Sequence, residues 1–159
     1  MISEMVDVDL LARAITWSGE EPVCRNEIFN LSNGDVVTLR GIWPVIADTM
    51  GMEVGPERPT SVAAYVHQRE REWAEIVRRH RLVAPTGRAQ MLGESCSVAD
   101  FYSGYASDVS TCTIVSSIKA RQAGFHECAD TDLIIRRWLL RYQELRLLPS
   151  SDGGFANSE

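Results

Sequence analysis

The chain has 159 residues, of which 45% are hydrophobic and 24% are charged. This composition is typical of one folded globular domain and excludes disorder as the main state. The formal net charge of −6 does not favour nucleic-acid binding, and the sequence has no apolar run of the about 18 residues that a membrane span requires. We therefore expect neither a nucleic acid nor a membrane as a partner.

The N-terminal residues and the cysteines bear on the cellular compartment. Acidic residues stand where a signal peptide carries basic ones, so we expect a cytoplasmic protein. The four cysteines form no C-x-x-C pair, which favours reduced thiols over a disulfide framework or a zinc site. Lys119 is the only lysine beside 15 arginines, a bias that indicates a GC-rich genome and a bacterial source.

Hydrophobic spacing and capping residues predict four features in the first third of the chain. In order, they are a helix capped by Asp7 and ending near Ser18 before Gly19, a short strand over residues 27–31, a turn over residues 32–35, and a helix from about Thr38 to Met50. Pro44 must lie in the first turn of that second helix, or it will bend it.

The remaining two thirds read mostly as helix. The expected elements are a helical region over residues 61–82 that could be two helices, a loop over 83–94, a helix over 97–105, a strand over 109–113, a helix from Ser116 or Ser117 to Ala123, and a last helix capped by Asp130. In the last helix the residues expected to face inward are Leu133, Ile134, Trp138, Tyr142 and Leu145. Residues 150–159 should form a disordered tail.

These elements predict an α+β fold that is mostly helical with two or three short strands, in a single domain over residues 1–149. Two or three short strands make a poor independent sheet. The strand over residues 27–31 therefore reads as one meant for a larger sheet.

The sequence lacks several motifs that would carry a reaction. It has no glycine-rich turn for a dinucleotide, and no tyrosine stands four residues before Lys119, the pair that short-chain dehydrogenases use. The segment Gly93–Ser97 lacks the last glycine of a hydrolase elbow. The three histidines have no zinc spacing. We therefore expect no bound cofactor and no metal.

Three features could still carry chemistry, each with a plainer alternative. Asp100 near aromatic residues could act as an acid or base, or could cap a helix or pair with an arginine. Cys96 could be a reactive thiol, or a buried inert one. The stretch from His126 to Asp130 could bind a metal, although a loop followed by a helix cap explains it better.

The order of short sequence pieces resembles one known family. Asn26–Asn30 with Asn33–Asp35, Trp43–Pro44, Trp73 to Leu82, Ala99–Phe101 and Lys119–His126 resemble, in order and spacing, the C-terminal portion of atypical extended short-chain dehydrogenase/reductases related to progesterone 5β-reductase and iridoid synthase. The family reduces enones or related carbonyl compounds with NAD(P)H. Its Rossmann half carries the cofactor and the catalytic residues, and its C-terminal half supplies the last strands and a helical substrate lid.

The resemblance implies that this chain corresponds to the second half alone and lacks the nucleotide-binding Rossmann half. The family has Trp and Phe where this chain has Cys96 and Val98, which would enlarge or reshape the pocket. The residues expected near a ligand are Cys96, Val98, Phe101, Tyr102 and Tyr105, and those that could act in catalysis are Asp100, Tyr102 and Tyr105.

Three functions follow from these observations. The first is a stand-alone domain that binds a small apolar molecule or a partner and has no redox machinery of its own. The second is a cofactor-independent isomerase, cyclase or lyase. The third is a fragment of an NAD(P)H-dependent enone or carbonyl reductase. In every case apolar surface on the first helix and strand 27–31 would be bare, so we expect a homodimer or a heteromer through them.

Overall fold

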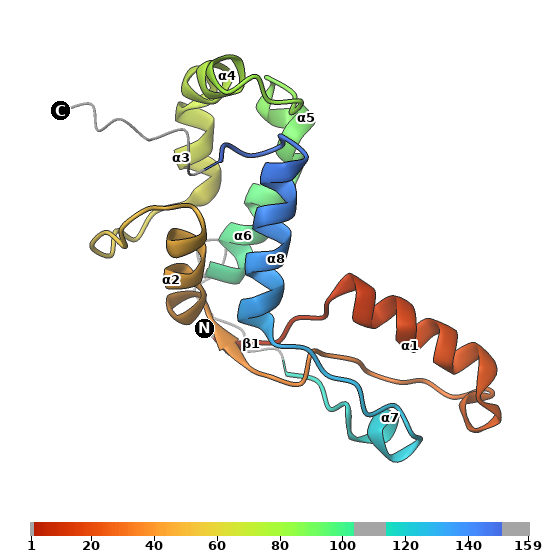
Figure 1. Cartoon of the computed structure of the whole chain (residues 1–159). Helices are drawn as coiled ribbons and strands as arrows, with labels where there is room; N and C mark the ends of the chain where they lie inside the picture. The colour runs from red at the N-terminus through yellow and green to blue at the C-terminus, as the bar shows by residue number, and fades with distance from the viewer. Residues whose placement is uncertain (1, 104–113, 151–159) are drawn as a thin grey trace.

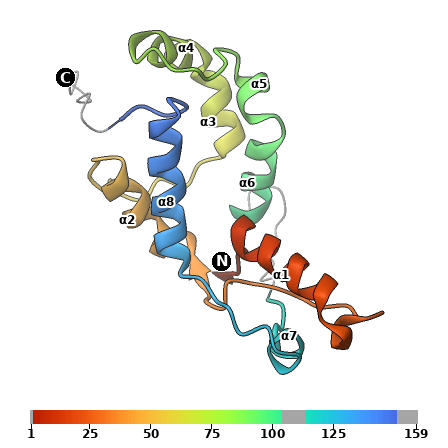
Figure 2. The ribbon, with the colours of Figure 1, turned by 45° about the vertical axis from the view of Figure 1, so that its right-hand side comes forward.

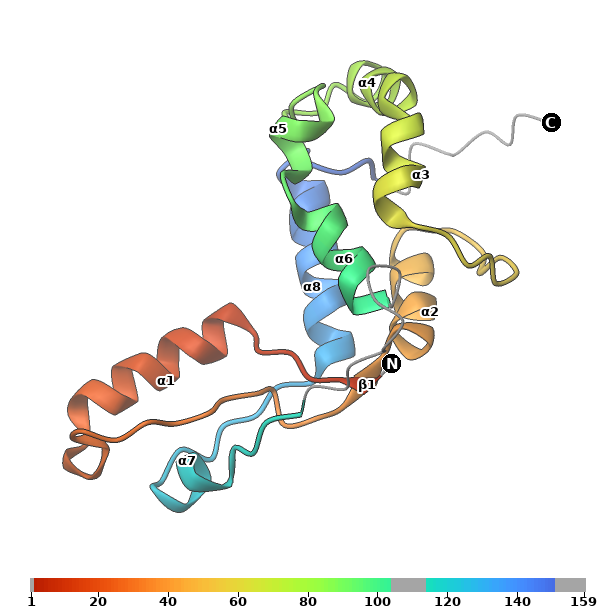
Figure 3. The same ribbon diagram turned by 180° about the vertical axis from the view of Figure 1, so that it is seen from behind.

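The computed structural model describes residues 2–103 and 114–150 and is mostly helical (Figure 1). Two parts are distinguished here. The arm comprises residues 8–31 and 116–129, and the body comprises residues 37–103 and 131–150. The front and back views both show the arm projecting away from the body (Figure 3).

The arm is built around helix α1 (Val8–Glu20). Leu10, Ala14 and Trp17 recur at helical spacing and face helix α7 (Ile118–Gln122), where Ala120 and Phe125 complete a small apolar cluster. A short 3-10 helix, η1 (Pro22–Cys24), turns the chain back, and an extended segment then runs beside α1 (Figure 2). Phe29 of that segment packs edge-on against Trp17, with ring centroids 5.4 Å apart.

Two packed helix pairs form the body. Helix α2 (Leu39–Thr49) packs against α8 (Thr131–Glu144), and α3 (Val62–Gln68) packs against α6 (Ser95–Ser103). Helices α4 (Glu70–Arg79) and α5 (Arg88–Leu92) lie at the end of the body away from the arm (Figure 1).

The described residues contain one sheet, and it is very small. Strand β1 (Ile2–Ser3) pairs antiparallel with β2 (Val37–Thr38) at the foot of α2. Within the described ranges no helix combines the length and the apolar character needed to cross a membrane.

Several expected elements are confirmed. The expected cap Asp130 accepts a hydrogen bond of 3.0 Å from the backbone N–H of Leu133. The helix expected from about Thr38 begins at Leu39, and Thr38 accepts a hydrogen bond of 3.0 Å from the N–H of Gly41. The helical region 61–82 is indeed two helices, which meet at Arg69. The fold is mostly helical with two short antiparallel strands, as expected of a partial α+β domain.

Other predictions about elements are wrong. Residues 27–31 are extended but form no strand, because no described segment pairs with their backbone. The expected loop over residues 83–94 contains α5. The observed strands β1 and β2 were not predicted from the sequence, because two residues are too few to show the alternation of apolar and polar side chains that marks a strand. The expected strand over 109–113 and most of the tail lie outside the described residues.

The details of two helices also differ from the prediction. Pro44 stands in the second turn of α2 rather than the first, so the carbonyl of Arg40 has no N–H donor at residue 44. In α8, Ile134 and Trp138 are half-buried, whereas Leu133, Tyr142 and Leu145 are exposed. The reason is that α8 packs closely against one helix, α2, and a single neighbour covers only one face.

Candidate functional site

Helix α6 carries most of the residues expected near a ligand. Cys96 and Asp100 are one turn apart on the face that packs against α3, and both are buried. Val98 and Phe101 are 51% and 47% exposed. The side chain of Tyr102 and the whole of Tyr105 lie outside the described residues, so the expected aromatic pocket stays a prediction.

The Asp100 carboxylate binds the start of α3. It accepts hydrogen bonds from the Ser61 hydroxyl (2.6 Å) and from the backbone N–H groups of Val62 (2.5 Å) and Ala63 (3.2 Å). The hydrogen bond from Ser61, together with the two backbone donors, outweighs desolvation and holds the pKa of Asp100 below 3.8. These contacts correspond to the helix-capping alternative, and an ionised carboxylate is poorly suited to donate a proton.

The other candidate residues are not gathered around Asp100. His126 lies in the arm, exposed and beyond α7, whereas Asp100 lies in the body. Cys96 is buried, as in its plainer interpretation. Asp130 caps α8, and among the described residues no three His, Cys, Asp or Glu side chains are placed to hold a metal ion.

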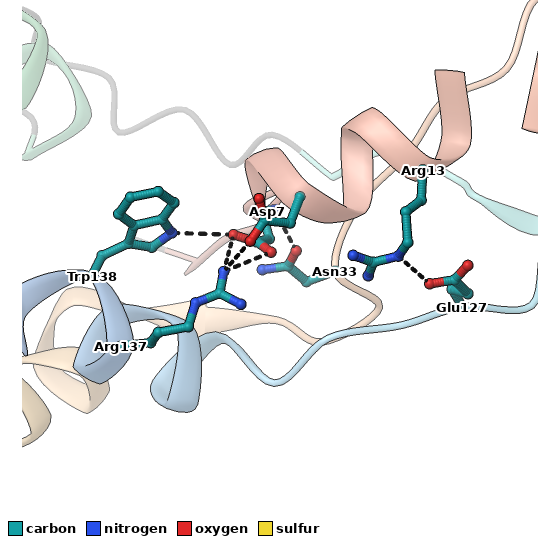
Figure 4. Close-up of polar contacts among 7 residues, drawn as sticks. Asp7, Arg13, Asn33, Glu127, Arg137 and Trp138 are labelled. Atoms are coloured by element: carbon teal, nitrogen blue, oxygen red, sulfur yellow. Dashed lines mark hydrogen bonds and ion pairs between the residues drawn. The ribbon is translucent and has the colours of Figure 1, made fainter. Parts of the chain in front are cut away.

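The most connected polar group joins the arm to the body (Figure 4). The Asp7 carboxylate, 5% exposed, accepts hydrogen bonds from Nη2 of Arg137 at 2.9 Å to each oxygen and from Nε1 of Trp138 at 3.2 Å. Burial raises the pKa of Asp7, but the hydrogen bonds from Trp138 and Arg137 outweigh it, and the pKa lies below 3.8. The carboxylate therefore holds α8 against the start of α1.

A second set of contacts continues from the Asp7 backbone. Its N–H donates to Oδ1 of Asn33 (2.7 Å), and Nδ2 of Asn33 donates to Oγ1 of Thr131 (2.9 Å). Asp35 accepts from the backbone N–H and the hydroxyl of Thr131 at 2.8 and 2.6 Å. Asn33 and Thr131 are each only 1% exposed, so this network is a buried junction.

Sequence reasoning missed this junction. It placed Asp7 correctly at the start of α1, but the side chain makes no capping bond there and binds α8 instead. It identified Asn33–Asp35 as a turn, and Gly34 does adopt a positive φ of 102°. No local pattern pairs those residues with Arg137 and Thr131, about 100 positions later in the chain.

Among the cavities that described residues line, two bear on ligand binding. The first, of about 380 Å³, is lined by the following residues of α3, α4, α5 and the chain after α8: Tyr65, Val66, Arg69, Glu70, Glu72, Trp73, Ile76, Met91, Leu92 and Leu148. The second, of about 370 Å³, lies beside β1 and the start of α2. Neither is lined by Cys96, Val98 or Phe101, although both have the size of small-molecule sites.

The extended segment of the arm leaves its backbone available. Among the described residues, the backbone groups of Ile28–Leu31 receive one hydrogen bond, from Nζ of Lys119 to the Ile28 carbonyl at 2.9 Å. Ile28 is 84% exposed, and on α1 Ile15 is 63% exposed. Within the described ranges, the segment is thus an apolar edge without a neighbouring strand.

The described residues do not fit a dinucleotide. Such a cofactor needs a glycine-rich turn between a strand of a parallel sheet and the N-terminus of a helix. The described sheet is one antiparallel pair of two-residue strands, and the full sequence has no glycine-rich motif of that kind. We therefore derive no step through NAD(P)H within this chain.

Comparison with known proteins gives the family resemblance a firm basis. The chain is 29% identical over 130 residues, 77% of its length, to (S)-8-oxocitronellyl enol synthase of Catharanthus roseus. It is 24% identical over 94% of its length to (S)-8-oxocitronellyl enol synthase ISY2 of Nepeta cataria, and 36% identical over 48% of its length to the CYC2 enzyme of Camptotheca acuminata. No family model matches the chain.

The homologues of this chain are thus iridoid synthases, which are short-chain dehydrogenase/reductases of the progesterone 5β-reductase type, and the resemblance predicted from sequence is confirmed. The chain spans only 31%, 37% and 20% of the lengths of the three relatives named. These relatives are plant proteins, so they give the expected bacterial source no support.

Proposed function

We propose that this chain is the substrate-binding part of an iridoid synthase-like reductase, and that it functions with a nucleotide-binding part which its own described residues do not provide. The observation that carries the proposal is the arm. It presents an apolar extended segment whose backbone has no neighbouring strand among the described residues, on a chain that spans 31% and 37% of the lengths of two relatives.

The surface chemistry of the arm supports docking to a sheet. A strand that adds to an exposed edge gains main-chain hydrogen bonds for affinity and alternate side-chain contacts for specificity. Phe29 and Leu31 are half-buried against the arm, while Ile28 is left to solvent. A partner strand beside residues 28–31 would satisfy the free backbone groups and cover Ile28.

The cavity between α3, α4 and α5 supports a small apolar ligand. The indole of Trp73 is fixed in its wall, because Nε1 donates to the Pro85 carbonyl at 2.9 Å. The chain after α8 is tied to this region by the Val83 N–H, which donates to the Arg146 carbonyl at 2.8 Å. We propose an oxygenated apolar ligand with the carbon skeleton that the names of the relatives imply, the 8-oxocitronellyl enol.

Isothermal titration of the purified chain tests both halves of the proposal. NADPH and NADH should give no saturable heat, because the described residues form no dinucleotide cradle. An NAD-dependent dehydrogenase is the positive control. Citronellal, a stable aldehyde with the citronellyl skeleton, should bind saturably. Stoichiometric binding of either dinucleotide would refute the division of labour, and absence of citronellal binding would refute the ligand.

The contacts of Asp100 do not favour a cofactor-independent isomerase, cyclase or lyase. Its acid–base candidate, Asp100, is held in three hydrogen bonds at the start of α3. No described contact places a second ionisable group beside it.

A further inference from the structure

The second cavity has a different character, because a carboxylate lies in its apolar wall. The cavity, of about 370 Å³, is lined by residues of β1, β2, the end of the extended segment and the start of α2. Figure 1 shows β1 beside the foot of α2. Its lining residues are Ser3, Glu4, Met5, Val6, Leu31, Ser32, Val37, Thr38, Leu39, Ile42 and Val115. We call it the Glu4 cavity.

The Glu4 carboxylate is anchored by two neighbours in the same wall. Oε2 accepts a hydrogen bond of 2.6 Å from the backbone N–H of Val115, and Oε1 accepts one of 3.3 Å from the Ser32 hydroxyl. The side chain is half-buried and its position is set from two sides. A carboxylate oxygen has two lone pairs, so with respect to the described residues each oxygen keeps one acceptor position for a ligand.

Charge then selects the ligand. Glu4 is the one ionisable residue in the lining, and among the described residues no cation forms an ion pair with it. A negative charge among apolar side chains favours a partner that brings a positive charge and an apolar body together. An anion would be repelled, and a neutral molecule would gain only the apolar contacts.

We propose that the Glu4 cavity binds a small apolar molecule that carries a primary ammonium group, with Glu4 as the recognition residue. The ammonium donates to the free lone pairs of the carboxylate, and the hydrocarbon packs against Leu31, Leu39 and Ile42. This site is separate from the cavity between α3, α4 and α5, and it does not depend on docking of a nucleotide-binding part.

The test compares three probes of one chain length at pH 7: hexylamine, hexanol and hexanoate. Titrations followed by ¹H–¹⁵N NMR report both affinity and location, because the Val115 amide donates directly to Glu4. We expect hexylamine to bind about tenfold more tightly than hexanol, the gain of one charge-assisted hydrogen bond, and to shift the Val115 signal. Hexanoate should bind more weakly than hexanol.

Two variants and one control test whether the preference for the amine arises from Glu4 and from this cavity. Glu4→Gln keeps an acceptor for Val115 but loses the charge, so hexylamine affinity should fall about tenfold to the level of hexanol. Leu39→Trp fills the mouth, where Leu39 is 49% exposed, and should weaken both probes. Glu53→Gln removes an exposed carboxylate elsewhere and should change nothing.

Equal affinities for the amine and the alcohol, or a Val115 signal that stays in place, would overturn the proposal. If Glu4→Gln does not fold, the proposal is tested by two other results: the order of affinities of the three probes for the wild type, and the weaker binding expected for Leu39→Trp. None of these outcomes bears on dinucleotide binding, so the two proposals fail independently.

Discussion

At the scale of single residues, Asp7 is the most deeply buried acidic residue in the described part of the chain. Its carboxylate is buried between the arm and α8 and is fully engaged by Arg137 and Trp138. The guanidinium of Arg137 remains half-exposed, with a side chain 51% accessible, and it also reaches Asp9 at 3.1 Å. The buried member of the ion pair is therefore the Asp7 carboxylate. Its removal should lower the free energy of unfolding more than removal of the exposed Asp9 carboxylate.

Asp7→Asn should lower the free energy of unfolding by about 1–3 kcal/mol, because the amide NH₂ would face donors where the carboxylate accepted hydrogen bonds. Urea denaturation followed by circular dichroism measures the change. Asp9→Asn is the matched control, since Asp9 contacts the same arginine from an exposed position. Equal losses in the two variants would show that the burial of Asp7 contributes nothing.

The lowered pKa of Asp7 also predicts a pH dependence. A carboxylate whose folded pKa is below its unfolded value of 3.8 adds stability that is fully present above 3.8 and is lost as the pH falls through the folded pKa. The stability difference between the wild type and Asp7→Asn should thus be constant near neutral pH and shrink below pH 3.8. Denaturation series at several pH values would measure it, and a difference that grows on acidification would contradict the assignment.

At the scale of elements, α3 depends on a residue from α6. It has seven residues, too few for a helix to be stable alone, and its first N–H groups are bound by Asp100 and by the Ser61 hydroxyl, which accepts from Ala64 at 3.0 Å. The carboxylate thus caps the helix from a distance and fixes the pairing of α3 with α6.

Asp100→Asn should leave the overall fold intact but increase amide hydrogen exchange in α3 several-fold, because one amide oxygen cannot replace two carboxylate oxygens. Hydrogen–deuterium exchange with mass spectrometry would show the effect at residues 62–68 and no change at α8. Ser61→Ala should give a smaller effect in the same place. Unchanged exchange in α3 would mean that the capping contact is not stabilising.

The elements predicted from sequence were those with local causes. Asp130 and Thr38 cap their helices through atoms three residues away, so α8 and α2 begin where expected. The segment over residues 27–31 has the side chains of a strand but forms none, because a strand needs a partner that local sequence cannot supply. Helix α5 was missed because Pro85, Gly87 and Gly93 around it are loop signals.

At the scale of the whole molecule, the described residues bury few apolar side chains and leave many large ones exposed to solvent. Among the described residues, Leu10, Ala14, Ala120 and Phe125 form a buried apolar cluster, and all four lie in the arm. Exposed apolar side chains in the arm include Val8, Ile15, Val23 and Ile28. Surfaces of this kind drive association in soluble proteins.

The isolated chain should therefore associate in solution, and Ile28→Asp should reduce this, because it adds a charge to the free edge. Leu133→Asp is the matched control, since Leu133 is 65% exposed on α8, outside the arm. Light scattering at micromolar concentration measures the mass of each variant. A monomeric wild type, or equal behaviour of the two variants, would contradict association through the arm.

The candidate site was only partly accessible to sequence reasoning. Val98, Asp100 and Phe101 lie on a helix as expected, whereas Cys96 stood outside the predicted helix 97–105 but is part of α6. Asp100 was interpreted as either an acid–base group or a residue that caps a helix or pairs with an arginine. The choice between these depended on Ser61 and Val62, about 39 positions earlier, which only packing of α3 on α6 brings close. No sequence pattern marked Glu4 as a binding residue, because its cavity is formed by four segments that are separate in the sequence.

The sequence by itself determined the helical character, the cap at Asp130 and the kinship with iridoid synthases, because these depend on local spacing and on residues compared one by one. The tertiary structure alone decided where Asp7, Asp100 and Glu4 point and whether residues 27–31 pair with another described segment. Those outcomes depend on contacts between segments up to 130 positions apart, for which a linear pattern holds no information.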